Sequence, residues 1–311
     1  MYPNPGKVRG IVTKSTGSWH DVLAEGKRYE CRMRGKLRLE EIKETNPVTV
    51  GDQVEFEVEE GSHVITKILP RKNQLLRQSV KKTGHSNLLA ANIDQAVLIA
   101  TLQQPRTSLG FIDRFLVSAE AYRIPQLLVF NKLDLLGSDA IAQVEDLKKK
   151  YERVGASVIG ASAISNEGID EFKKNLIGKI SLLTGHSGAG KSTLLNLLSP
   201  GLNQSTSEIS HFSEKGTHTT TFAEMFALDE KTFVIDTPGI KEWGLVDMTQ
   251  QEISDYFPEM RDLRLKCKFG SKCLHLQEPG CVVRPAVENG TIAQSRWESY
   301  VSMVEGRDNR K

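Results

Sequence analysis

Short stretches of alternating hydrophobic and polar residues fill the first part of the chain. They lie at residues 10–12, 29–33, 53–58 and 63–68, and Gly, Asn-Pro or Gly-Asp turns separate them. Such alternation is typical of half-buried β-strands. Several short strands in succession predict a small barrel over residues 1–72, for which the oligonucleotide-binding (OB) fold is the favoured form.

The pattern changes from about residue 92. Continuous apolar runs at 96–100, 126–130, 156–160 and 180–184 alternate with stretches of helical spacing at 111–123, 138–153, 167–176 and up to Leu198. This β-α alternation predicts a parallel sheet with helices on both faces. We assign residues 73–240 to this α/β domain. Residues 241–311, where the pattern becomes helical and rich in loops, form a separate C-terminal domain.

Composition places the chain among globular proteins of two or three domains. It has 311 residues, of which 39% are hydrophobic and 26% charged. No apolar run is long enough to span a bilayer, and the first residues lack the apolar core of a secretory signal. These features predict a cytoplasmic protein. The net charge is only +2, but basic residues gather in segments 27–38 and 62–90. Each segment could contact phosphate backbones or could simply be solvated.

The most informative motif is a glycine-rich loop that fits G-x-x-x-x-G-K-[ST]. An apolar strand precedes it, and an apolar helix beginning at Thr193 follows. The motif predicts that backbone N–H groups surround phosphate oxygens, that Lys191 reaches the β- and γ-phosphates and that Ser192 ligates Mg²⁺. Its residues are Gly185, His186, Ser187, Gly188, Ala189, Gly190, Lys191 and Ser192, and Thr193 after them is also predicted to bind GTP.

Two further motifs follow predicted strands and point to guanine. Asn131, Lys132 and Asp134 form N-K-x-D after the strand at 126–130. A carboxylate at Asp134 can accept from N1–H and N2–H₂ of guanine, which adenine lacks, while Asn131 lies near O6/N7 and Lys132 packs over the base. Ser162 and Ala163 follow the next strand, where a backbone N–H can meet O6.

A buried strand at residues 233–236 delivers Asp236 to its end, before Thr-Pro-Gly. Asp236 can hold Mg²⁺ through water, and the backbone N–H of Gly239 can reach the γ-phosphate. In ordinary GTPases the phosphate loop comes first; here it follows N-K-x-D and S-A. The cyclic order is unchanged, which indicates a circular permutation. The turn at Gly239 then leads directly into the C-terminal domain, so nucleotide-driven movement there should reach that domain.

Three of the four cysteines cluster late in the chain, within one histidine-containing segment. Cys267, Cys273, His275 and Cys281 offer three thiolates and an imidazole, a set that suits a structural tetrahedral Zn²⁺ site. Buried free thiols beside an unrelated histidine are the alternative. Cys31 stands alone and is expected to pack within a strand.

Together these features resemble the RsgA (YjeQ) family, the circularly permuted GTPases of bacterial small-ribosomal-subunit assembly. The resemblance covers the barrel, the permuted GTPase domain and the zinc domain. It implies the guanine, phosphate and zinc residues already named, and a switch segment at Gly216–Thr221. The family usually carries Arg where this chain has Thr217. The implied partners are the small ribosomal subunit with its rRNA, GTP and GDP, and other assembly factors, with no membrane and a monomeric chain.

Catalysis is expected to involve the switch segment. Ile240 stands where Ras-like enzymes place the glutamine that orients the attacking water. His218 is the candidate for this role, and His186 is a competitor. Thr219 or Thr220 would ligate Mg²⁺ when the segment closes, and the spacing favours Thr219.

Two other classes of protein compete with this interpretation. One is an RNA-binding module whose degenerate nucleotide site binds without turnover, against which Lys191, Ser192, Asp236 and Asp134 speak. The other is a P-loop kinase or ATPase, against which the Asn131–Asp134 motif speaks.

Overall fold

The computed structural model describes residues 7–35, 47–59, 62–78, 86–198, 223–237 and 248–307. The chain divides into two compact units. Unit 1 comprises Met1–Ala96, Lys173–Thr184 and Lys191–Ile240, and unit 2 comprises Val97–Phe172, Gly185–Gly190 and Lys241–Lys311. Among the described residues, no helix combines the length and the apolar character that a membrane span requires.

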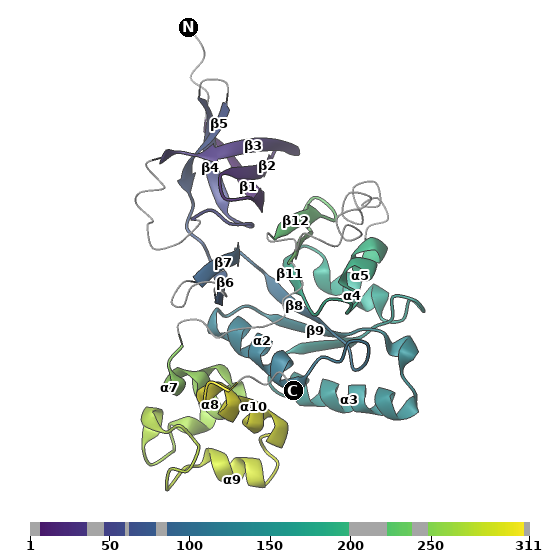
Figure 1. Cartoon of the computed structure of the whole chain (residues 1–311), viewed down its shortest axis with the longest axis vertical. Coiled ribbons are helices and arrows are strands. Elements are labelled where there is room, and N and C mark those ends of the chain that lie inside the picture. Colours follow the sequence, from purple (N-terminus) through teal and green to yellow (C-terminus); the bar gives the residue numbers. More distant parts are fainter. Residues whose placement is uncertain are drawn as a thin grey trace. The chain divides into compact units, whose positions relative to one another are not determined.

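Unit 1 begins with a closed five-stranded barrel (purple and blue in Figure 1). The strands follow the order β1-β2-β3-β5-β4, and β4 pairs back with β1. Among the described strand pairs of the barrel, only β3–β5 is parallel. Alternate residues point inward and form the barrel core, which includes Val12, Cys31 and Phe56. This confirms the small barrel and the packing of Cys31. The strands are Val8–Ser15, Trp19–Ala24, Lys27–Met33, Gln53–Glu59 and Ser62–Ile68.

The rest of unit 1 contributes a hairpin and part of the α/β architecture. The hairpin pairs β6 (Gln74–Gln78) with β7 (Ser86–Ala91). Strand β11 (Ile180–Thr184) lies parallel to β13 (Phe233–Asp236), and helix α5 spans Lys191–Leu198. The short strand β12 (Glu224–Ala227) runs antiparallel to β13, so the sheet is not purely parallel as expected. Its outer neighbour is barrel strand β1.

Unit 2 contains the other part of the α/β architecture. Strands β10 (Ser157–Gly160), β9 (Gln126–Phe130) and β8 (Gln95–Ala100) lie in that order, and β9 and β10 are parallel. The connecting helices are α2 (Leu109–Ala121), α3 (Ser138–Glu152) and α4 (Ile169–Leu176), which continues into unit 1. Helix α2 starts at Ser108, whose side chain accepts from Phe111 N. These elements lie where the sequence pattern predicts them.

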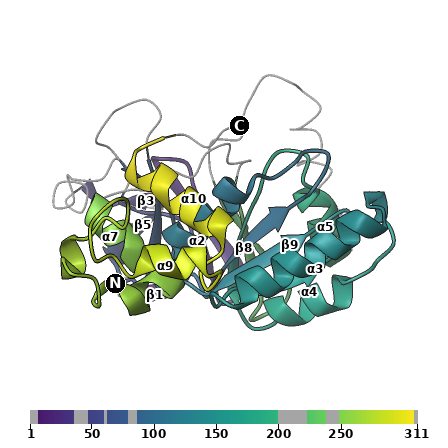
Figure 2. The ribbon, with the colours of Figure 1, turned by 90° about the horizontal axis from the view of Figure 1, so that it is seen from below.

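Short helices make up the C-terminal part of unit 2, with α10 beside α2 (Figures 1 and 2). Their core gathers Phe257, Met260, Tyr300 and the three clustered cysteines, and Val117 of α2 completes it. The C-terminal helices therefore share a core of their own, and one residue of α2 joins it. They are α7 (Gln250–Ile253), α8 (Pro258–Arg264), α9 (Val283–Glu288) and α10 (Gln294–Val304), with 3₁₀ turns η3 (Ser254–Tyr256) and η4 (Gly270–Lys272).

His20, on the inner face of β2, makes the barrel sensitive to acid. Its side chain is fully buried, and its Nδ1 lies 3.1 Å from Ser15 Oγ. Burial lowers the pKa of His20 from 6.5 to about 4, although Asp21 opposes the shift. A lowered histidine pKa means that protons bind the unfolded chain more readily. Stability is therefore full above pH 6.5 and is lost as the pH falls toward 4.

We expect the barrel to lose about 2 kcal/mol of unfolding free energy between pH 7 and pH 5 through this one residue. The variant His20→Leu should lack that part of the loss, since leucine fills the site without titrating, and Ser15 Oγ still donates to Val48 O. Urea unfolding of both proteins at the two pH values measures the difference. Parallel losses in the two proteins would show that His20 is not responsible.

Candidate nucleotide and metal sites

The phosphate loop, residues 185–190, has a backbone that only glycine fits at two positions. Gly185 has φ +149°, and a Cβ there would lie 2.4 Å from Ile99 O. Gly190 has φ +93°, and a Cβ there would lie 2.3 Å from Asn131 Nδ2. Side chains rarely adopt such φ values, and neither contact leaves room for a carbon atom. The two glycines therefore let the loop press against the ends of β8 and β9.

Asn131 holds the phosphate loop directly. Its side chain is 3% exposed, and Nδ2 donates to Ala189 O at 2.9 Å. Asn131 Oδ1 is buried and has no hydrogen-bond partner among the described residues. The sequence suggested Asn131 only as a base contact. The tie to Ala189 has no signal in the sequence, because it depends on how the two loops meet.

His186, a competitor for the catalytic role, packs against helix α2. Its ring centroid lies 4.2 Å from that of Phe111, with 37° between the planes. Ser187 and Gly188 are exposed and Ala189 is buried. The structure thus uses the His186 ring in packing.

The N-K-x-D and S-A motifs meet in unit 2. Ser162 is fully buried, and its Oγ donates to Asp134 Oδ1. Asp134 itself is exposed in the 3₁₀ turn η1 (Leu133–Leu135), and Ala163 beside Ser162 is half-buried. Lys132 has a left-handed backbone, and its Nζ donates to Gln104 O in the loop after β8. Ser162 therefore orients the carboxylate that is predicted to read the base, a role that its motif alone does not reveal.

Lys191 and Asp236 lie together in unit 1. Lys191 and Ser192 open helix α5, with Thr193 next, and Asp236 ends β13. Burial raises the pKa of Asp236 to about 6, Lys191 opposes this and Glu224 adds to it. Asp236 Oδ1 is buried and has no hydrogen-bond partner among the described residues. A buried carboxylate oxygen without a partner suits Mg²⁺ and its water ligands.

Three predicted site residues fall outside the described residues. They are His218 and Thr219, in segment 199–222, and Gly239, in segment 238–247. Their roles stay predictions from the sequence.

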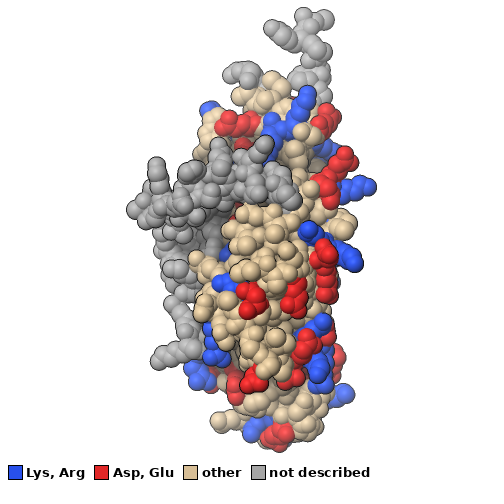
Figure 3. All heavy atoms as spheres, turned by 90° about the vertical axis from the view of Figure 1, so that its right-hand side faces the viewer, with Lys and Arg blue, Asp and Glu red and all other residues tan. Residues whose placement is uncertain are grey.

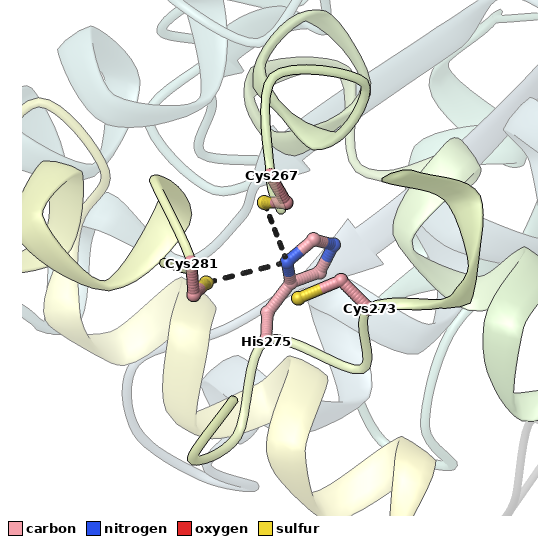
Figure 4. Close-up of side chains that lie close together, drawn as sticks. All are labelled: Cys267, Cys273, His275 and Cys281. Atoms are coloured by element: carbon pink, nitrogen blue, oxygen red, sulfur yellow. Dashed lines mark hydrogen bonds between the residues drawn. The ribbon is translucent and has the colours of Figure 1, made fainter. Parts of the chain in front are cut away.

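The Cys-Cys-His-Cys cluster forms in the C-terminal region as predicted (Figure 4). Its four ligand atoms lie within 4.8 Å of one another. His275 Nδ1 is 3.6 Å from Cys267 Sγ and 3.5 Å from Cys281 Sγ, and Cys273 points to the same centre. The backbone N–H of Val282 points at Cys267 Sγ from 3.4 Å. The imidazole therefore presents Nδ1 to the three sulfur atoms.

Glu278 fixes the loop that carries His275. Its carboxylate accepts from the backbone N–H groups of Leu274, Leu276 and Gln277 at 2.8–3.1 Å. His275 is held there with φ +57°. Glu278 was not predicted from the sequence; its one signal there is that it is an acidic residue within the cysteine spacing.

Burial makes free thiols of this cluster poor acids. It raises the pKa of Cys273 to about 12 and also raises that of Cys281. A metal ion reverses this preference because it binds the thiolate form. Three sulfur atoms and one nitrogen around one buried centre fit a four-coordinate metal, so the cluster can hold a metal ion.

The permuted order of the phosphate loop, the N-K-x-D turn and the strand-end aspartate defines a circularly permuted P-loop GTPase. The RsgA GTPase family model matches residues 68–246, and the RsgA N-terminal domain model matches residues 9–65. The chain belongs to the RsgA GTPase family.

Relatives and solved structures agree along nearly the whole chain. The small ribosomal subunit biogenesis GTPase RsgA of Christiangramia forsetii is 49% identical over 306 residues, 97% of each chain. That of Bacteroides fragilis is 46% identical over 98% of each chain. YjeQ from Thermotoga maritima matches with TM-score 0.77 and 38% identity, over 98% of this chain and 100% of that one. YloQ, described as a circularly permuted GTPase, matches with TM-score 0.74 and 29% identity, over 100% of this chain and 98% of that one.

The raised pKa of Asp236 predicts that Mg²⁺-dependent nucleotide binding weakens in acid. Its protonated form is favoured on folding, so this contribution to stability is present below pH 3.8 and is lost as the pH rises through about 6. Mg²⁺ needs the deprotonated form, so a proton competes with it below pH 6. We expect about tenfold weaker Mg²⁺-dependent binding of GTP at pH 5 than at pH 7 from this group.

Calorimetric titration of GTP at fixed Mg²⁺, at several pH values, tests this. Asp236→Asn should bind more weakly at pH 7 and lack that part of the pH dependence, while titration of the nucleotide itself remains in both proteins. Identical pH profiles in the two proteins would rule out Asp236 as the titrating group.

Proposed function

We propose that this chain is a GTPase of small-ribosomal-subunit biogenesis, which binds the 30S subunit late in its maturation and hydrolyses GTP to GDP and phosphate with subunit-stimulated turnover. The observation that carries the proposal is the phosphate loop tied to N-K-x-D, within a chain nearly half identical to RsgA relatives along their length. A ribosomal role also supports a cytoplasmic location and other assembly factors as partners, and we further propose that the chain is a monomer.

We assign the nucleotide contacts as follows. Asp134 reads the N1–H and N2–H₂ of guanine, with Asn131 near the base, Lys132 over it and the Ala163 backbone at O6. The backbone of Gly185–Gly190 and the side chain of Lys191 contact the phosphates, and Gly239 contacts the γ-phosphate. Ser192 and Thr219 coordinate Mg²⁺ directly, and Asp236 binds it through a water molecule. Bound Mg²⁺ would neutralise charge on the phosphates.

The hydrolytic step needs a group that positions water, since Ile240 cannot do so. His218 is our candidate, carried toward the γ-phosphate when the switch segment closes. An imidazole there can orient the water or donate to developing charge.

The barrel offers a surface suited to RNA on strands β2 and β3. Trp19 is 38% exposed, and the Arg32 guanidinium lies 4.0 Å from its ring centroid. Such stacked pairs can hold unpaired bases, and exposed Lys27 and Arg28 add positive charge.

Other basic residues of the barrel have structural uses. Arg71 forms a two-pronged ion pair with the buried Asp52, at 2.7 and 2.9 Å, and also donates to Pro47 O. Lys72 pairs with Asp94. These two residues of segment 62–90 are therefore fixed by protein contacts. On the face in Figure 3, positive and negative side chains are interspersed.

The C-terminal cluster is proposed to bind one structural Zn²⁺ through Cys267, Cys273, His275 and Cys281. The three lysines around it, Lys266, Lys268 and Lys272, can meet rRNA phosphates. The domain boundaries 1–72, 73–240 and 241–311 remain part of the proposal.

Zinc removal should unfold the C-terminal helices. We expect about one zinc per chain, and its binding would contribute on the order of 10 kcal/mol. The double variant Cys273→Ser, Cys281→Ser should lack zinc and lose helical signal, whereas Cys31→Ala, in the barrel core, should keep it. Elemental analysis with circular dichroism decides, and freshly purified protein without zinc would refute the metal assignment.

Guanine selectivity should rest on Asp134. Asp134→Asn should weaken GTP binding and improve binding of xanthosine triphosphate, because an amide complements the xanthine edge. Asp139→Asn, an exposed residue in the first turn of α3, is the matched control. If competition binding shows GTP affinity within about threefold of the wild type, under ~0.7 kcal/mol, the assignment of Asp134 is wrong.

Turnover should be slow alone and faster on purified small subunits, since unassisted GTPases turn over as slowly as ~10⁻⁴ s⁻¹. His218→Ala should keep GTP and subunit binding and lose stimulated turnover by ~10²-fold. His211→Ala, in the same segment, is the control. Phosphate release with and without subunits measures this. Equal rates in the two conditions would contradict the proposed function, and a fully active His218→Ala would move the water-positioning group elsewhere.

A further inference from the structure

Helix α2 contacts the phosphate loop at its first turn. Phe111 is 7% exposed, and its ring lies against that of His186, the second residue of the loop. An aromatic contact of this kind contributes roughly as much as a hydrogen bond and also fixes ring orientation. The position of Phe111 therefore constrains the backbone at residue 186.

Two residues further along α2, Asp113 anchors the C-terminal helices. Arg296 of α10 is fully buried and donates from Nη1 to Asp113 Oδ1 at 2.9 Å. The same guanidinium donates to both carboxylate oxygens of Glu259 in α8, from Nε at 2.7 Å and from Nη2 at 3.1 Å. It also lies over the Phe257 ring. A buried charge that loses its partner is strongly destabilising, so these three groups hold α2, α8 and α10 in one arrangement.

Further contacts along α2 prevent it from moving independently of those helices. Val117 belongs to the C-terminal core, and Glu120 pairs with Arg261 of α8 at 2.8 Å. Near the start of the helix, Arg114 donates to Arg307 O at 2.6 Å, beyond α10. Phe111 and Asp113 share one helical turn, so a shift of the C-terminal helices at Asp113 displaces Phe111 as well.

Three contacts among the described residues of unit 2 bear on the position of the phosphate loop: Gly185 lies against Ile99, Ala189 accepts from Asn131 and His186 packs on Phe111. The first two come from strand ends, and the third comes from α2, to which the C-terminal helices are bound at Asp113. We infer that Phe111, Asp113 and Arg296 are positioning residues for the phosphate loop: docking of the C-terminal helices on α2 fixes the loop in its phosphate-binding form. This rests on the proposed GTP site.

The test is a double-mutant cycle on the full-length, metal-loaded protein, read out as the calorimetric Kd for GDP. Phe111→Leu should raise Kd about fivefold, because the loop then visits other conformations that bind no phosphate. Asp113→Asn keeps the volume and an acceptor for Arg296, and should raise Kd about threefold. Since both act through α2, the double variant should raise Kd no more than about fivefold. Phe172→Leu, the same change at a fully buried ring in α4, should leave Kd within about twofold.

Melting temperatures are measured alongside, because a purely structural role would lower them and leave Kd unchanged. That outcome for Phe111→Leu would overturn the inference, as would a multiplicative, roughly fifteenfold effect in the double variant. If Asp113→Asn does not fold, Phe111→Leu and its control still decide. Lys191→Ala separates the two hypotheses. If it binds GDP like the wild type, the proposed site is wrong; if it loses binding while Phe111→Leu does not, only the positioning role is wrong.

Discussion

The nucleotide site depends on the short phosphate loop, residues 185–190. Contacts with neighbouring segments, rather than interactions within the loop, fix its conformation. Residues 185–190 combine left-handed glycines with few side chains, so neighbouring groups must fix them. Those groups stand at the end of β8, after β9 and at the start of α2. Because the end of each strand, rather than its place in the chain, positions the site, the motifs can be cut and rejoined in another cyclic order without losing the loop.

Much of this architecture could be predicted from the sequence, because buried strands and amphipathic helices leave strong periodic signals. The runs at 96–100, 126–130 and 180–184 became strands as expected. Strand β2 was missed since His20 and Asp21 interrupt its apolar pattern. Strand β12 was missed because only Met225 of its four residues is buried, so it leaves no buried apolar run in the sequence. No sequence pattern could reveal that His20 is buried, or that Arg71 forms an ion pair with the buried Asp52.

Within the site, residue types were predictable and their ties were not. The motif residues predict a phosphate loop and a guanine-binding turn, but the hydrogen bonds from Asn131 to Ala189 and from Ser162 to Asp134 join distant segments. Similarly, the cysteine spacing indicated a metal centre, while the support from Glu278 appeared only in three dimensions. In the predicted nucleotide site and in the metal cluster alike, the residue expected to meet the ligand belongs to a recognisable sequence motif. The residue that orients it can be found only from the fold.

The pairing of Asp113 with Arg296 has a consequence for how a newly made chain folds. The two residues are 183 positions apart, and chains grow at about 5–20 residues per second. Helix α2 is therefore synthesised roughly ten to forty seconds before its guanidinium partner. During that interval the Asp113 carboxylate has to stay hydrated, and the surface of α2 around Val117 has no C-terminal core to cover it. The contact between α2 and α10 can therefore form only after α10 has been made. Folding of unit 2 is thus completed late, by a contact between residues far apart in the sequence.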